Sequence, residues 1–438
     1  MRTAAGRLAD HARIIAAAVA AAGSMLASLG CSPRDPATPL TSAEQTPPPN
    51  PQAVANPIAA PLSTGVPAPD LAAAFAYSRE HQGDGVLILR NGTEVAAEFG
   101  NGFAATTPHL LASGTKSFSG IAAALAVADG LLSLDERVSD TITEWRGDDA
   151  KRDVTVRQLL SLSAGIESLS AVIDNPRNAR AAGVTDRAQA SIQARSIARP
   201  GARFIYGPSS FYVFGELMRR KLTAAGTGDV DIVAYLDRRV FQPLGIAPRF
   251  LRDEAGNANL PGGCRVSARD WAVFGEMVRR GGVHVDAQGH EVRILDQAGL
   301  DELLRPHGPN VRYGLTWWLL RPGDADPEDA IAADLAADRL DAAGNGPIRR
   351  AMRDRLRARA EAAIAADVAA IAADAAEHTE QPISGYMAAG KGKQRLYVIP
   401  EHGLTIVRFG DINGGRDFSD ARFLELVREG LELPSPQR

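Results

Sequence analysis

Lysine is scarce in this chain. Of the 48 basic residues only five are lysines, and the rest are arginines. An arginine does not release its proton at physiological pH, so it cannot serve as a general base. A lysine within a motif is therefore more informative here than in a chain of ordinary composition. The five are Lys116, Lys151, Lys221, Lys391 and Lys393.

Other features are also absent. The eight histidines are scattered without metal-ligand spacing. The sequence also has no Gly-x-Ser-x-Gly motif, which would indicate a serine that acts with a histidine in a Ser-His-Asp triad. We therefore expect no metal and no other cofactor. A net charge of −4 gives no reason to expect nucleic acid or an anionic membrane surface as a partner. With 438 residues, 45% of them apolar, the chain is long enough for one large soluble domain or two closely packed ones.

The first 30 residues have the pattern of an export signal. Three arginines precede an apolar run over residues 14–29 that is too short and alanine-rich for a membrane span. The run ends at Ser28-Leu29-Gly30-Cys31, which resembles the lipobox of bacterial lipoproteins, although leucine stands two residues before the cysteine instead of three. The resemblance implies a lipidated Cys31 and a periplasmic protein attached to the membrane. A plain secretory signal is the alternative.

Cys264 is the second of two cysteines, so modification or removal of Cys31 would leave no internal disulfide. Residues 31–69 are rich in Pro, Ala and Thr, which is typical of an extended tether. We expect the folded domain to span residues 70–433.

The order of predicted elements indicates an α+β fold. Hairpins are predicted at both ends of the domain, over 85–99 around Asn91-Gly92 and over 394–410 around Pro400 to Gly403. Helices are predicted over 70–79, 113–129, 154–162, 211–222 and 418–431. We expect the terminal strands to share one antiparallel sheet, with a helical region inserted between them.

The stretch from Leu111 to Gly120 holds the strongest chemical signal. Ser113 and Lys116 are three residues apart at the start of a predicted helix, so their side chains share one face. The helix dipole favours an alkoxide there, and burial favours a neutral lysine, which can take a proton from serine. The pair therefore predicts a nucleophile with its own base. The alternative is an ordinary surface lysine near a helix start.

Seven stretches in order resemble the serine β-lactamase-related hydrolases. This group contains class C β-lactamases, family VIII carboxylesterases and D-amino-acid-specific peptidases. The resemblance covers residues 70–320 and 384–433 and implies an α/β sandwich beside an all-helical lobe, with the active site between them. The stretches are 113–120, 132–138, 154–166, 200–206, 262–270, 313–318 and 396–400.

The resemblance implies roles for three residues. Ser113 matches the nucleophile, Lys116 its base, and Tyr206 the tyrosine that relays protons to the leaving group. By itself, Tyr206 would be interpreted as a half-buried aromatic beside a Gly-Pro turn, and the preceding residues 200–205 favour the family role instead. The asparagine expected two residues after the tyrosine is replaced by Pro208, which has no side-chain hydrogen bond to offer. Ser209 or Ser210 could replace it, although helix capping is the more usual role of such serines.

The third family motif is expected at Ala388-Ala389-Gly390. Here the glycine is present and the family's cation, which holds a substrate carboxylate, is absent. Lys391 and Lys393 would compensate if their side chains turned inward, and would face water otherwise. The resemblance also implies an oxyanion hole made by the backbone N–H groups of Ser113 and Lys391. Gly390, Lys391 and Lys393 are therefore candidate substrate-binding residues.

Residues 322–382 do not fit the family pattern. They are rich in Ala, Asp and Arg, with apolar residues on one helical stripe. We expect a helical insertion, which could be a lid over the cleft, a solvated hairpin or a subunit contact.

These observations favour a serine hydrolase of small ester or amide substrates. We expect it to be esterase-like, because the third motif lacks its cation at Ala388 and the tyrosine motif lacks its asparagine at Pro208. One alternative is a D-peptidase or β-lactamase acting on cell-wall-like substrates. Others are a non-catalytic penicillin-binding-type envelope protein and a purely structural lipoprotein.

Overall fold

The computed structural model describes residues 70–174, 176–286, 288–322, 326–327, 382–415 and 417–434. The predicted signal peptide, the tether, Cys31 and nearly all of the predicted insertion lie outside these residues and stay predictions. The helices are α2 (Ala72–Glu80), α3 (Lys116–Ala128), α4 (Val156–Leu160), α5 (Ser170–Ile173), α6 (Pro176–Ala181), α7 (Arg187–Ile192), α8 (Ser209–Ala225), α9 (Ile232–Leu236), α10 (Gln242–Leu244), α11 (Ala268–Arg279), α12 (Gln297–Leu303) and α15 (Asp420–Gly430).

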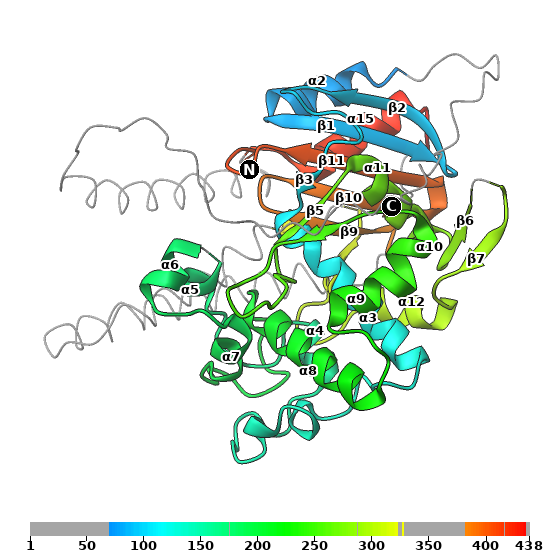
Figure 1. Ribbon diagram of the computed structural model, residues 1–438. Coiled ribbons are helices and arrows are strands. Elements are labelled where there is room, and N and C mark those ends of the chain that lie inside the picture. Colours follow the sequence, from blue (N-terminus) through cyan, green and yellow to red (C-terminus); the bar gives the residue numbers. More distant parts are fainter. Residues whose placement is uncertain are drawn as a thin grey trace, which may run out of the picture. The chain divides into compact units, whose positions relative to one another are not determined.

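The main sheet has six antiparallel strands in the order β2-β1-β11-β10-β9-β8 (Figure 1). Its strands are β1 (Gly83–Arg90), β2 (Thr93–Phe99), β8 (Trp318–Leu320), β9 (Gly385–Gly390), β10 (Gln394–Ile399) and β11 (Leu404–Gly410). Two small sheets hold β3 (His109–Leu110), β4 (Arg249–Phe250), β5 (Cys264–Val266), β6 (Val283–Val285) and β7 (Glu291–Arg293).

The first and last strands of the domain pair with each other, β1 with β11, which confirms the predicted shared sheet and the α+β class. Asn91 and Gly92 form the predicted two-residue turn between β1 and β2, with φ of 52° and 83°. The chain thus returns to its first hairpin after building a helical region between α3 and α12.

Helices cover both faces of the sheet. On β10, Arg395 hydrogen-bonds to Asp420 of α15, while the next residue, Leu396, lies against Gly275 of α11. Successive strand residues point to opposite faces, so α15 and α11 lie on opposite sides. α2 packs with α15, and Arg408 of β11 reaches Ser78 of α2. The face toward α2 and α15 therefore holds buried arginines.

Helix α3 runs through the centre of the domain. All residues from Lys116 to Ala126 are buried, as its small, alanine-rich sequence allows. The Phe118 ring lies 4.6 Å from that of Phe274 on α11 and 5.5 Å from that of Phe241 in the helical region. α3 thus joins the sheet side of the molecule to its helices. The predicted helix over 113–129 begins as a 3₁₀ turn, Ala112–Thr115, before α3.

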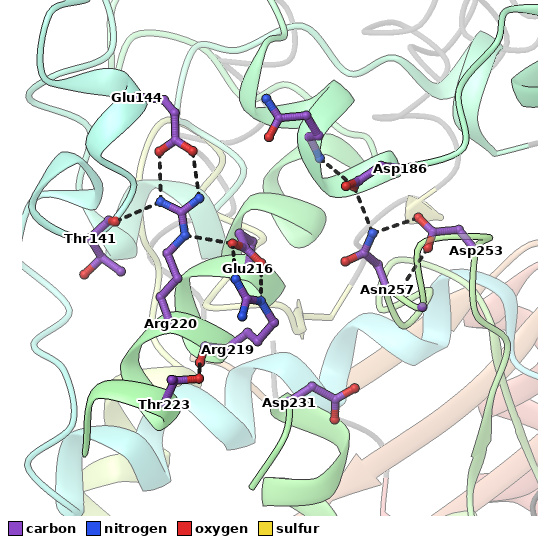
Figure 2. Close-up of polar contacts among 12 residues, drawn as sticks. Thr141, Glu144, Asp186, Glu216, Arg219, Arg220, Thr223, Asp231, Asp253 and Asn257 are labelled. Carbon is purple, nitrogen blue, oxygen red and sulfur yellow. Dashed lines mark hydrogen bonds and ion pairs between the residues drawn. The ribbon is translucent and has the colours of Figure 1, made fainter. Parts of the chain in front are cut away.

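Charged side chains tie the helical region together (Figure 2). Arg220 of α8 donates to both carboxylate oxygens of Glu144, at 2.8 and 2.7 Å, and to Glu216 at 2.7 Å. Elsewhere in the same view Asn257 donates to Asp186 at 2.9 Å and to Asp253 at 3.0 Å. Asp186 is also the N-cap of α7. The two bonds of Asn257 hold the loop after β4, which leads to the candidate site.

Candidate active site

A strained turn carries Ser113. Just before it, the Leu111 N–H donates to the Cys264 carbonyl at 2.9 Å, which continues the pairing of β3 with β5. Ala112 then has a φ of 46°, in the left-handed region that residues other than glycine seldom adopt. The Thr115 hydroxyl holds this turn by donating to the Ala112 carbonyl at 2.7 Å. Tertiary contacts, rather than helix propensity, thus set the position of the partly buried Ser113.

Lys116 is buried directly behind the serine. Its Nζ donates to Ser113 Oγ at 2.9 Å and to the Pro261 carbonyl at 2.7 Å, and the residue is only 4% exposed. Burial lowers the Lys116 pKa to about 8, and the negative charge of Asp174 opposes that shift. The two residues that the sequence singled out are thus in contact, and the amine has no carboxylate among its hydrogen-bond partners in the described residues.

The carbonyl that holds Lys116 belongs to a fixed loop. Pro261 follows the segment anchored by Asn257 (Figure 2), and the Gly262 N–H donates to the Asn259 side-chain oxygen at 3.1 Å. A neutral carbonyl orients the ammonium group without adding a full negative charge, so it leaves the lowered pKa in place. The sequence analysis did not identify this carbonyl.

Tyr206 lies beside the lysine. Its ring centroid is 4.8 Å from Lys116 Nζ, and the residue is 8% exposed. The segment before Tyr206 is held in place because the Ile205 N–H donates to the Leu162 carbonyl at 2.7 Å. The structure therefore brings Ser113, Lys116 and Tyr206 together, an arrangement that the resemblance implied.

The residues after Tyr206 start helix α8. Pro208 occupies the N-cap position of α8, which has no side-chain capping bond, so the capping role expected for a serine is wrong. Ser209 is instead the first helical residue, and its hydroxyl donates to the Ser168 carbonyl at 2.7 Å. Ser210 is 6% exposed. The Ser209 bond ties the tyrosine segment to the chain leading into α5.

The end of β9 packs against the serine turn. A Cβ atom on Gly390 would lie 2.0 Å from the Leu111 carbonyl oxygen and 3.0 Å from the Gly114 nitrogen, so only glycine fits there. β8 pairs with β9 only as far as Met387, and residues 388–390 run on past it toward Ser113. The third motif thus lies where the resemblance implied.

The two lysines after Gly390 differ. Lys391 is exposed at the turn between β9 and β10. Lys393 is 6% exposed, and its Nζ lies 2.9 Å from Asp326 Oδ2. Asp326 in turn accepts a bond from the Asp420 N–H at the start of α15. This ion pair holds the Lys393 ammonium on the α15 side of the sheet, which counts against a substrate-binding role for it.

Asp174 adds negative charge near the lysine. It follows α5 and is solvent-exposed. Surrounding protein nevertheless raises the pKa of this carboxyl, and the positive charges of Lys116 and Arg187 oppose the shift. The Asp174 side chain therefore meets both water and protein. No sequence motif marks Asp174, so pattern reasoning had no means of finding it.

Two features are absent from the residues that the structure describes. These residues contain no group of three or more His, Cys, Asp or Glu side chains placed to hold a metal ion. No helix within them has both the length and the hydropathy needed to cross a membrane.

Comparison with known proteins gives one family and several solved structures of similar fold. The Beta-lactamase family model matches residues 69–428, whereas no curated protein matches. A proposed 6-aminohexanoate-dimer hydrolase from Bacillus anthracis is 17% identical with a TM-score of 0.56, covering 82% of this chain and 83% of its own. A D-stereospecific amidohydrolase from Streptomyces sp. is 14% identical with a TM-score of 0.53, covering 83% and 98%.

A third solved structure, EstCE1, a hydrolase with promiscuous acyltransferase activity, is 17% identical with a TM-score of 0.52, covering 82% of this chain and 97% of its own. At these identities the structures show a shared fold. The family model, by contrast, spans nearly all of the folded domain that carries the Ser113 turn, Lys116 and Tyr206. The chain therefore belongs to the β-lactamase family of hydrolases.

Proposed function

We propose that this protein is a serine hydrolase that cleaves small ester or amide substrates through an acyl-enzyme on Ser113. The observation that carries the proposal is the 2.9 Å contact between Ser113 Oγ and a buried Lys116 with a lowered pKa. A lysine in this state is suited to take the serine proton as the hydroxyl attacks a carbonyl carbon.

The pKa of Lys116 decides whether it is an effective base. With a value of about 8, roughly a quarter of the molecules would hold a neutral amine at pH 7.5, against about one in a thousand for an unperturbed lysine. Burial thus raises the reactive population about two-hundredfold. The burial of Lys116 therefore supports its proposed role as the base.

The proposed reaction has two stages. Lys116 accepts the Ser113 proton as Oγ attacks, and the N–H groups of Ser113 and Lys391 bind the resulting oxyanion. The leaving group then takes a proton from Lys116, with Tyr206 beside it to pass the proton on. Water attacks the acyl-enzyme in the second stage, and the same groups act in reverse.

Substrate preference follows from the charges around the serine. Ala388 and Pro208 stand where the resemblance places a cation and an amide, and Asp174 adds a negative charge. A substrate carboxylate, which β-lactams carry, would find repulsion at Asp174 and no cation at position 388. We therefore favour neutral esters over β-lactams.

The test compares wild type with Ser113→Ala on p-nitrophenyl esters and nitrocefin. We expect ester turnover by wild type, little or none on nitrocefin, and loss of the ester activity to the buffer rate in the variant. A fluorophosphonate probe followed by mass spectrometry should place the adduct on Ser113. Ester hydrolysis that survives Ser113→Ala would refute the assignment.

A second candidate is amide hydrolysis of short D-peptides or similar substrates with a free amine. Asp174 favours it because an exposed carboxylate whose charge acts on Lys116 would also attract a substrate ammonium. The likeness to the Streptomyces D-stereospecific amidohydrolase agrees with this reading. A stable Ser113 adduct without turnover of any ester or amide would instead support a non-catalytic penicillin-binding-type role.

A further inference from the structure

Two fully buried arginines lie behind the turn that joins β9 to β10. Both Arg395 and Arg408 have no exposed surface. Arg395 contacts the Asp420 carboxylate with two nitrogens, Nε to Oδ1 at 2.8 Å and Nη2 to Oδ2 at 3.1 Å. Its remaining nitrogen, Nη1, donates to the Gly390 carbonyl at 3.1 Å and to the Gln394 carbonyl at 3.2 Å. One guanidinium group thus joins α15 to the last residue of β9.

The Gly390 carbonyl and the Lys391 N–H belong to the same peptide group. No described peptide bond is cis, so the two point in opposite directions. Arg395 holds the carbonyl side of this peptide, and the N–H side is the one assigned above to the oxyanion hole. We propose that Arg395 is a positioning residue that fixes the orientation of the Lys391 N–H and strengthens it as a donor. This inference rests on the proposed function.

The physical effect has two parts. A planar guanidinium held by a carboxylate has little freedom, so it fixes the plane of the peptide that it contacts. A charged donor on the carbonyl also draws electron density away from the amide nitrogen, and hydrogen bonds in such chains strengthen one another. The developing oxyanion would then meet a donor that needs no reorientation during the reaction.

Stability by itself is a weak explanation for this pair. A buried ion pair loses its hydration, and well-packed apolar residues often stabilise a fold as well or better. The Asp420 carboxylate is kept charged at some expense: burial raises its pKa, but Arg395 and a bond from the Tyr397 hydroxyl outweigh that effect and lower it overall. The fold thus keeps a cation in contact with the Gly390 carbonyl, although stability does not require one there.

Arg408 provides the matched control. It is equally buried and also bonds to the turn, but to the carbonyls of Lys393 at 2.9 Å and Gly392 at 3.4 Å. Other contacts of Arg408 reach Ser78 of α2 and His81 just after it, and its guanidinium lies 4.1 Å from the centroid of the Phe418 ring. It does not contact the peptide between Gly390 and Lys391. Removing Arg408 therefore disturbs the same turn without releasing the proposed donor.

The experiment compares Arg395→Gln with Arg408→Gln in two readouts, ester kinetics and inhibition by phenylboronic acid, a probe of the tetrahedral adduct on Ser113. We expect Arg395→Gln to lower kcat about tenfold with little change in KM, and to weaken boronate binding by a similar factor. Arg408→Gln should lower the unfolding temperature but change boronate binding less than threefold. Titration of Ser113 with the fluorophosphonate corrects both for the folded fraction.

A conservative pair covers the case in which a glutamine variant does not fold. Arg395→Lys keeps the charge but loses the planar set of N–H donors that contacts Asp420 and Gly390. We expect about a threefold loss of boronate affinity for Arg395→Lys and no loss for Arg408→Lys. Equal boronate affinity in wild type and the Arg395 variants, or an equal loss in the Arg408 variants, would overturn the inference and leave the proposed function standing. A wild type that forms no Ser113 adduct at all would overturn both.

Discussion

Two buried lysines differ in the partners that the fold gives them. Lys116 and Lys393 are 4% and 6% exposed. Lys393 has a carboxylate partner, Asp326, 2.9 Å away, whereas Lys116 bonds to a hydroxyl and a carbonyl. Burial with a counter-charge holds an ammonium in place. Burial against neutral groups makes the proton easier to lose, as the lowered pKa of Lys116 shows.

A third lysine belongs with the paired group. Lys151 is 7% exposed, and its Nζ lies 3.2 Å from Asp148 and 3.3 Å from the Ile192 carbonyl. The comparison therefore predicts that chemistry depends on Lys116, and stability on Lys151 and Lys393. The substitutions below test that division, beginning with the largest effect.

Replacing Lys116 should abolish catalysis. We expect Lys116→Met to lower kcat/KM for esters by about 10³-fold or more, because Ser113 loses its base. The same substitution in Lys151 should change kcat/KM by less than threefold while lowering stability. Ester kinetics of the two purified variants, each scaled to its folded fraction, check this. Comparable losses in both would show that burial, rather than the contact with Ser113, matters.

Stability should change in opposite directions at the two lysines. Below about pH 8, Lys116 is charged in the folded protein although its surroundings favour the neutral form. Such a lowered lysine pKa destabilises the fold below about pH 8, and the penalty is relieved as pH rises toward the unfolded value. The penalty is about 3 kcal/mol at pH 7, less about 1 kcal/mol for the bond to Pro261 that methionine would lose.

Lys116→Met should therefore raise the free energy of unfolding at pH 7 by about 2 kcal/mol. Lys393→Met should lower it by about 3 kcal/mol, because it leaves the Asp326 carboxylate partly buried without its partner. Urea unfolding of both variants at pH 7 measures the two values, and repeating it near pH 10 should shrink the gain from Lys116→Met. A loss of stability in both variants would contradict the comparison.

The geometry of the candidate site agrees with several expectations drawn from the sequence. Ser113 and Lys116 were singled out by their three-residue spacing at a predicted helix start, and Tyr206 by the resemblance of residues 200–206. Gly390 was placed through the resemblance, by counting back from Gln394 across the hairpin turn between β10 and β9. Lys393 shows the limit of that method, because the side chain that holds it, Asp326, lies 67 residues earlier in the chain.

Pro261, Asp174 and Arg395 were missed for a similar reason. Pro261 acts through a backbone carbonyl, which has no residue-specific signal. Asp174 and Arg395 are single charged residues in segments without a motif, and their importance comes only from what the fold places beside them. The sheet itself was predictable, because the turn residues at Asn91-Gly92 and the apolar runs of both terminal hairpins are local signals.

The smallest expected effect is on the pH dependence of activity. Since Lys116 must be neutral to act as a base, kcat/KM for esters should rise with pH through a pKa of about 8 and level off above it. Asp174 holds the Lys116 pKa up, because its negative charge favours the ammonium form. Asp174→Asn keeps the shape of the side chain and removes that charge, so the rising limb should move to lower pH by about half a unit. Activity at pH 7 would then increase about twofold to threefold for a neutral ester.

Asp174→Asn should also change the preference between charged and neutral substrates. An ester bearing an ammonium group should lose its advantage over a neutral isostere. Rate profiles from pH 6 to 10 with the two substrates distinguish these effects, and a limb that stays in place or moves upward would show that Asp174 does not act on Lys116.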